Sequence, residues 1–132
     1  MMHSMKSELQ LLQPGGSIVN AASIAGVRGM PGTAAYCASK HGVVGLTRAA
    51  AKEVGAKGIR INAVAPGYID TPMLGKAVEA AGAERVDAGV AMIPIARKAD
   101  PEEVAKVIAF LLGEESSFVT GAIYSVDGGW NV

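Results

Sequence analysis

The segment "IRINAVAPG" at residues 59–67 indicates a parallel sheet, because it is a short apolar run of the buried-strand type that ends at a Pro-Gly pair. The run "SIVNAAS" at 17–23 has the same character, and "GAIYSVDGG" at 121–129 reads as a third strand with its turn. A long helix is predicted at 34–56, between the first two strands. Strands that alternate with helices favour parallel pairing through right-handed crossovers.

Further helices are predicted at both ends of this pattern. Residues 2–13 have helical spacing of apolar side chains. Near residue 100, Asp100 can cap a helix, Pro101 suits its first turn and Glu103 occupies the capping-box position. This helix is predicted to end at Gly113. Its apolar stripe consists of Val104, Val107, Ile108, Leu111 and Leu112.

The predicted order of elements is α-β-α-β-α-α-β, which is an α/β fold. Residues 70–99 are the ambiguous part, since they are rich in Ala and Gly and show only weak helical patterning around 73–88. The chain has 132 residues, enough for one modest domain. A three-stranded sheet leaves at least one edge exposed, so we expect part of the sheet to be missing or supplied by a partner.

The composition argues against several classes of function. Twelve basic and twelve acidic residues give a formal net charge of zero, which excludes the basic excess that nucleic acids and acidic membranes require. No apolar run is long enough to cross a bilayer, and the N-terminus does not resemble a secretory signal. Cys37 is the single cysteine, so a reducing, cytoplasmic location is expected, with Cys37 as a small packing residue. The two histidines have no metal-ligand spacing, and no metal is expected.

Tyr36 and Lys40 are four positions apart in the predicted helix, so their side chains share one face. A free phenol has a pKa near 10, and lowering such a value by three units takes roughly 4 kcal/mol. A unit positive charge about 4 Å away supplies about that much at an effective dielectric of 20. The pair can therefore exchange a proton with a carbonyl or alcohol oxygen. It can equally be an amphipathic tyrosine beside a snorkelling lysine.

Ser23 supplies a context for this pair. It follows the first strand, and the second strand ends in "PGYIDTP". Ligands of open α/β sheets bind at the carboxyl ends of the strands, so these segments can converge on one crevice with the start of the Tyr36 helix. A serine hydroxyl there can stabilise charge on a carbonyl oxygen. Taken alone, Ser23 is a turn or capping serine.

Four motifs in this order resemble the short-chain dehydrogenase/reductase family, in its classical branch. They are "SIVNAASIAG" around Ser23, "YCASK" with Tyr36 and Lys40, "IRINAVAPGYIDTPM" for the second strand and cofactor loop, and "GAIYSVDGGW" at the C-terminal end. The match covers essentially the whole chain but only the C-terminal half of the family's fold. It implies a truncated Rossmann-like parallel sheet with flanking helices, in which the N-terminal dinucleotide-binding half is absent. Residues 1–132 would then be a single partial domain that carries the catalytic and substrate half.

The resemblance implies an oxidoreductase that transfers a hydride between NAD(P) and a carbonyl or secondary alcohol substrate. Tyr36 would be the catalytic acid/base, and Ser23 would position the substrate oxygen. Lys40 would make the phenol more acidic and bind the nicotinamide ribose. Residues 70–99 would be a mobile substrate lid. The residues implied to contact the cofactor are Tyr36, Lys40, Pro66, Gly67, Ile69 and Thr71.

The sequence departs from the family in its phosphate-binding part. The glycine run "PGGS" at 14–17 follows a helix and precedes a strand, whereas the family's glycine-rich turn follows a strand. The residue that reads the adenosine ribose is also absent, so NAD and NADP are implied equally. A truncated, non-catalytic relative that acts as an association or binding module is therefore the alternative.

Two further expectations concern the substrate and the partners. Tyr124, Trp130 and residues 70–99 are expected to shape the substrate pocket, although the sequence does not name the substrate. A homo-oligomer is expected, because small residues on the Tyr36 helix permit close approach of another helix. These small residues are Ala38, Gly42, Gly45 and Ala49.

Overall fold

The computed structural model describes residues 2–132, and it has three strands flanked by helices. The strands are β1 (Ser17–Ala21), β2 (Arg60–Pro66) and β3 (Ile123–Val126). The α-helices are α1 (Met2–Leu11), α2 (Ala34–Val54), α3 (Pro72–Ala81), α4 (Ala83–Ala91) and α5 (Pro101–Leu112). Short 3-10 helices are η1 (Ile24–Gly26), η2 (Gly55–Lys57) and η3 (Glu114–Ser116).

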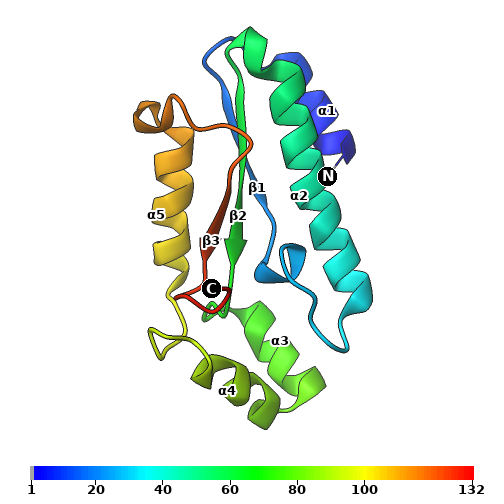
Figure 1. Cartoon of the computed structure of the whole chain (residues 1–132), viewed down its shortest axis with the longest axis vertical. Coiled ribbons are helices and arrows are strands. Elements are labelled where there is room, and N and C mark those ends of the chain that lie inside the picture. The colour runs from blue at the N-terminus through cyan, green and yellow to red at the C-terminus, as the bar shows by residue number, and fades with distance from the viewer. Residues whose placement is uncertain (1) are drawn as a thin grey trace.

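The sheet is parallel throughout, with the strand order β1-β2-β3. In the register, Ser17 lies opposite Arg60, and Ala63 lies opposite Ile123. Helices α1 and α2 cover one face and α5 covers the other (Figure 1). This is the α/β, Rossmann-like arrangement that the alternation of strands and helices predicted. The outer edge of β1 carries no strand among the described residues.

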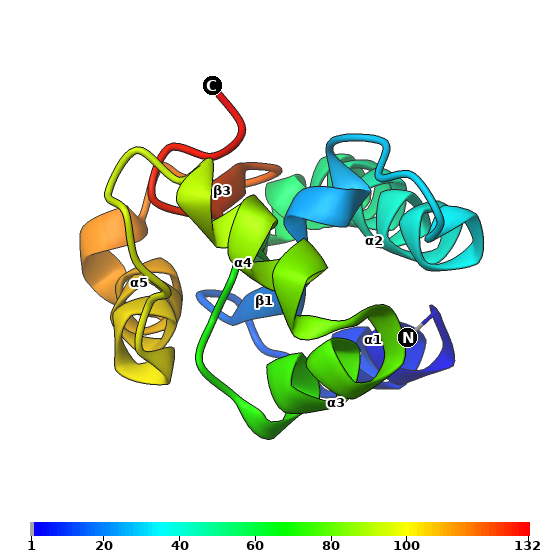
Figure 2. The same cartoon turned by 90° about the horizontal axis from the view of Figure 1, so that it is seen from below.

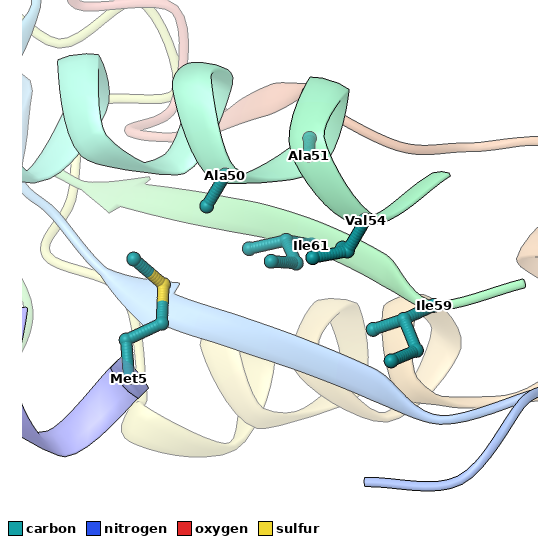
Figure 3. Packing of buried hydrophobic residues seen from close by; sticks show 6 residues of the cluster. All are labelled: Met5, Ala50, Ala51, Val54, Ile59 and Ile61. Atoms are coloured by element: carbon teal, nitrogen blue, oxygen red, sulfur yellow. The ribbon is translucent and has the colours of Figure 1, made fainter. Parts of the chain in front are cut away.

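The side chains of β2 alternate between the two faces of the sheet, as the pleat requires. Ile61 points toward α2, where it packs with Met5 of α1 and with side chains of α2 (Figure 3). Val64 points the other way, toward Val104 and Leu111 of α5. Because both faces are covered, β2 is buried over its central five residues, four of which are apolar. The fifth, Asn62, donates to the carbonyl of Val119 and accepts the N–H of Ala122.

Arg60 caps the C-terminal end of α5. Its guanidinium donates to the carbonyl oxygens of Leu111 at 2.8 Å and Gly113 at 2.9 Å, and to the hydroxyl of Ser116 at 2.7 Å. The last carbonyls of a helix have no partner within it, so a cation from β2 satisfies them. The first residue of β2 therefore ties α5 to the sheet.

Several boundaries differ from those that the sequence predicted. The first strand ends at Ala21, because Ser23 caps η1 instead of continuing the strand. The long helix ends at Val54 and is followed by η2, and Gly58 then takes a left-handed conformation with φ +72°. The strands predicted at 59–67 and 121–129 are shorter, at 60–66 and 123–126. The ambiguous segment holds two helices, α3 and α4.

The start of α5 is as predicted, and Glu103 makes its capping bond. The Glu103 carboxylate accepts the backbone N–H of Asp100 at 2.8 Å and pairs with both guanidinium nitrogens of Arg97, at 2.7 and 2.8 Å. The bonds from Arg97 first, and then the one from Asp100, lower the pKa of Glu103 from 4.5 to about 2. The folded state therefore holds the carboxylate ionised at pH values where the unfolded chain would protonate it.

Replacing Glu103 with glutamine is expected to flatten the acid limb of the stability curve. Because the pKa is lower in the folded state, Glu103 stabilises the fold above about pH 4.5, and this contribution is lost as pH falls toward about 2. Both partners are exposed, so the effect should be modest and should shrink at high salt. Melting temperatures between pH 5 and pH 2 test this, with Glu102→Gln as the control. Equal slopes for the wild type and Glu103→Gln would contradict it.

Candidate active site

Loops from all three strands meet at the carboxyl edge of the sheet, and α3 and α4 lie across that edge (Figures 1 and 2). The first loop follows β1 and leads through η1 to α2. The second follows β2 and leads to α3, and the third is the C-terminal segment after β3. This edge is where open α/β sheets bind their ligands.

Ser23 lies two residues beyond β1 and caps η1. Its hydroxyl oxygen accepts the backbone N–H of Ala25 at 3.2 Å. A serine that accepts one hydrogen bond still has its own proton to donate. Capping and substrate contact are therefore compatible at this position.

Tyr36 and Lys40 lie in the first two turns of α2. Tyr36 is 44% exposed, so its phenol is accessible at this edge. The Lys40 ammonium nitrogen lies 5.6 Å from the centre of the Tyr36 ring and donates to the carbonyl oxygen of Ala21 at 3.0 Å. Ala21 is the last residue of β1, so this bond ties the lysine to the strand that leads to Ser23. Within the described residues Lys40 forms no ion pair, and its positive charge is not neutralised by a carboxylate.

Gly26 explains why the Ser23 turn lies against α2. A side-chain carbon at Gly26 would lie 2.7 Å from the carbonyl oxygen of Lys40, which is closer than real contacts allow. Glycine here lets η1 approach the helix backbone. The sequence "SIAG" thus brings Ser23 to the same edge as Tyr36 and Lys40.

The predicted cofactor loop, Pro66 to Thr71, is held mainly by backbone contacts. Gly67 donates to the carbonyl of Val126 at 3.0 Å, and a side-chain carbon at Gly67 would lie 2.9 Å from that of Asp127. Ile69 forms an isolated bridge with Ala99 and packs against the α5 side of the core. Thr71 caps α3, and its hydroxyl accepts the N–H of Leu74 at 3.4 Å. The structure therefore places this loop at the same edge as Tyr36, while giving Ile69 and Thr71 structural roles of their own.

A cluster around Trp130 was not identified from the sequence as a unit. The Arg28 guanidinium lies 5.3 Å from the centre of the Trp130 ring, and Tyr68 meets the same indole edge-on with ring centres 6.4 Å apart. The cluster joins the loops that follow all three strands. Tyr68 belongs to the "PGYIDTP" motif, but its partner Trp130 lies 62 residues further along the chain. Local sequence patterns therefore do not predict that the two rings meet.

Two hollows lie near these elements. One of about 330 Å³ lies between the β2–α3 loop, the turn after β3 and the start of α5, and its lining includes Tyr68, Arg97 and Asp127. Another of about 430 Å³ lies between α1 and the free edge of β1. Neither is lined by Ser23, Tyr36 or Lys40. Of the three predicted catalytic residues, Tyr36 is exposed, whereas Ser23 and Lys40 are half-buried.

Two classes of site find no support in residues 2–132. No three side chains of His, Cys, Asp or Glu are grouped there as a metal ion would require. Every helix in the same range is too short or too polar to cross a membrane. Cys37 is buried, with its sulfur 3.4 Å from the Thr33 hydroxyl, which fits the packing role expected for it.

Comparison with known proteins gives one family. The family model described as enoyl-(acyl carrier protein) reductase matches residues 1–131. A short-chain dehydrogenase/reductase, aba4, of Botryotinia fuckeliana is 49% identical over 131 residues, which are 98% of this chain and 51% of that protein. The 3-oxoacyl-acyl-carrier-protein reductase FabG of Thermotoga maritima is 50% identical over 117 residues, 89% of this chain and 46% of that protein. The chain thus spans about half the length of the curated relatives that it matches.

Solved structures agree with this result. A short-chain dehydrogenase/reductase of the glucose/ribitol dehydrogenase type from Brucella melitensis matches with a TM-score of 0.89 and 38% identity, over 99% of this chain and 51% of that one. An actinorhodin polyketide ketoreductase with NADPH matches with a TM-score of 0.82 and 41% identity, over 88% of this chain and 47% of that one. The match of sequence and fold over nearly the whole chain means that this protein belongs to the short-chain dehydrogenase/reductase family.

Proposed function

We propose that this chain carries the proton-transfer part of an NAD(P)-dependent oxidoreductase that interconverts a carbonyl and a secondary alcohol. One observation supports this most directly. The Lys40 ammonium is bonded to the end of β1 and lies over the Tyr36 ring, and Ser23 follows on the same loop. A phenol, a cation and a hydroxyl at one edge are what protonation of a carbonyl oxygen requires.

The proposed role of each residue follows from its chemistry. Tyr36 donates its phenolic proton to the substrate oxygen during reduction and takes it back during oxidation. Ser23 donates a hydrogen bond to the same oxygen and so stabilises the charge that develops on it. Lys40 favours negative charge on the phenol oxygen during the transfer. A bound nicotinamide supplies or accepts the hydride.

The residues present fit the nicotinamide end of a dinucleotide. Lys40 can donate to a ribose hydroxyl because its ammonium has three protons and uses one on Ala21. Tyr36 and the loop formed by Pro66, Gly67, Ile69 and Thr71 would complete this end of the site. Our proposal covers NAD and NADP alike.

The alternative is a non-catalytic association module that has kept Ser23, Tyr36 and Lys40 but does not bind a dinucleotide. The outer face of α2 favours it, because Ala38, Gly42, Gly45 and Ala49 are all exposed there. A second copy of α2 could approach closely over these small residues, and a homo-oligomer through this face is part of both proposals. Sedimentation velocity measures the oligomeric state directly.

Cofactor titration separates the two proposals. We expect the purified chain to bind NADH or NADPH saturably, as followed by nicotinamide fluorescence. Lys40→Met should weaken binding roughly tenfold or more, because a charged hydrogen bond is worth about 1.5–3 kcal/mol. Lys52→Met, which removes an exposed lysine near the far end of the same helix, is the matched control. No binding at millimolar cofactor would instead support the association module.

A further inference from the structure

Helix α4 crosses the carboxyl edge of the sheet and contacts two of the loops that form the candidate site (Figure 2). Arg85 and Gly89 are four residues apart, so they lie on one face of this helix. Arg85 contacts the loop after β1, and Gly89 contacts the loop after β2. Val86, beside them, is buried.

Arg85 binds the turn that leads into the Tyr36 helix. Its guanidinium donates to the carbonyl oxygen of Pro31 at 2.6 Å. The next residue, Gly32, has φ +80°, and a side-chain carbon there would lie 3.1 Å from the same guanidinium. Glycine therefore gives this turn both its left-handed conformation and the room for the arginine.

The turn is rigidly connected to the start of α2. Thr33 donates to the carbonyl of Met30 from both its backbone N–H, at 3.2 Å, and its hydroxyl, at 2.9 Å. Cys37 then donates its N–H to the Thr33 carbonyl at 2.8 Å. Tyr36 lies between Thr33 and Cys37, so its backbone is tied by these bonds to the turn that Arg85 contacts.

Gly89 is the contact at the other end of α4. The Tyr68 hydroxyl lies against the helix where a side chain at Gly89 would have to be, so no larger residue fits without moving the tyrosine. Tyr68 also meets Trp130 edge-on. The Tyr68 side chain therefore lies between α4 and Trp130 of the C-terminal segment.

We propose that α4 is a clamp that joins the loop before the Tyr36 helix to the loop after β2, with Arg85 as a positioning residue for Tyr36. The clamp rests on the proposed function only in that the edge of the sheet crossed by α4 is the edge that carries Ser23, Tyr36 and Lys40. Its two contacts hold the Pro31–Gly32 turn and Tyr68 at fixed separation.

Hydrogen exchange of the whole chain tests the clamp without cofactor or substrate. Arg85→Met is expected to speed amide exchange roughly tenfold in residues 28–33 and 83–91, and to leave β2 unchanged. Lys76→Met removes the same charge from exposed α3 and should change neither segment. Arg85→Lys keeps one donor and should give intermediate rates. The same rates in Arg85→Met as in the wild type, or equal acceleration by Lys76→Met, would overturn the proposal.

The other end of the clamp has its own test. Gly89→Ala should displace Tyr68 and change the fluorescence of Trp130, the single tryptophan of the chain. Gly75→Ala is the control, since a side chain there meets nothing within 4 Å. Unchanged fluorescence in Gly89→Ala would overturn this contact.

Measurements of kcat and cofactor affinity then show whether Arg85 positions Tyr36 or only stabilises the fold. In a preparation that turns over, Arg85→Met should lower kcat while cofactor affinity stays constant, and Arg85→Lys should recover part of the loss. A loss of cofactor affinity equal to the loss of kcat would contradict a positioning role. Failure of the exchange test leaves the oxidoreductase proposal standing, and absence of cofactor binding leaves the clamp standing.

Discussion

Replacing Tyr36 with phenylalanine is expected to lower kcat for carbonyl reduction by a factor of about 10² to 10⁴, the usual contribution of a positioned general acid. The substitution removes one oxygen atom from a side chain that is 44% exposed, so packing of α2 should not change. The proton for the substrate oxygen would then have to come from water. The measurement is oxidation of NADH or NADPH by a preparation that binds the cofactor, at saturating cofactor and substrate.

The matched control is Tyr124→Phe, which removes the same atom from a half-buried tyrosine in β3. Tyr124 is expected from the sequence to shape the substrate pocket, but in the structure its ring packs against the cluster of Val64, Val104 and Leu111, on the face of the sheet opposite α2. Tyr124→Phe should therefore leave kcat unchanged. Tyr36→Phe should weaken cofactor binding much less than Lys40→Met does, because Lys40 keeps its bond to Ala21 and its two other protons can still be donated. Turnover that persists in Tyr36→Phe would remove the phenol from the mechanism while leaving the family assignment intact.

The fold could be predicted largely because its signals are local. Pro101 and Glu103 mark the start of α5 within four residues of sequence, and the structure places the helix there. The sequence does not predict the helices of residues 70–99 in the same way. Yet Thr71 and Pro72 form an ordinary helix start, and Gly82, with φ +86°, separates α3 from α4. These signals were present, but the Ala- and Gly-rich composition of the segment obscured them.

In the candidate site, too, local motifs could be read from the sequence, whereas contacts between distant residues could not. The motifs name Ser23, Tyr36 and Lys40, and the structure places all three at one edge of the sheet, where their roles remain proposals. Contacts such as Arg85 with Pro31, 54 residues apart, depend on the path of the chain between them. No spacing rule reaches that far, because helix and strand periodicities describe neighbours within one element. The clamp therefore becomes visible only in three dimensions.

The stripe of α5 shows how a periodic pattern can still misplace a residue. Leu111 and Leu112 were both assigned to the buried face. In the structure Leu111 is fully buried, whereas Leu112 is 48% exposed. Successive residues on a helix point about 100° apart, so only one of two neighbours can face the sheet squarely.

This pair gives the second large prediction. Leu111→Ala is expected to reduce the free energy of unfolding by about 2–5 kcal/mol, the range for removing a buried leucine. Leu111 packs with Val64 and Val104, and Ile69 of the loop after β2 packs against the same cluster. The lost side chain would leave a cavity between the central strand and α5, which the surrounding backbone can fill only in part.

Leu112→Ala is the neighbouring control, with an expected loss below about 1 kcal/mol because its side chain is half exposed. Both substitutions keep the backbone carbonyls that Arg60 binds, so the difference between them isolates side-chain burial. Urea unfolding followed by circular dichroism measures it. Equal losses in the two variants would mean that α5 does not present Leu111 to the sheet. Ile69 packs against the cluster that contains Leu111, so Leu111→Ala should also speed amide exchange in residues 67–71. This result would link the core beneath α5 to the loop proposed to hold the cofactor.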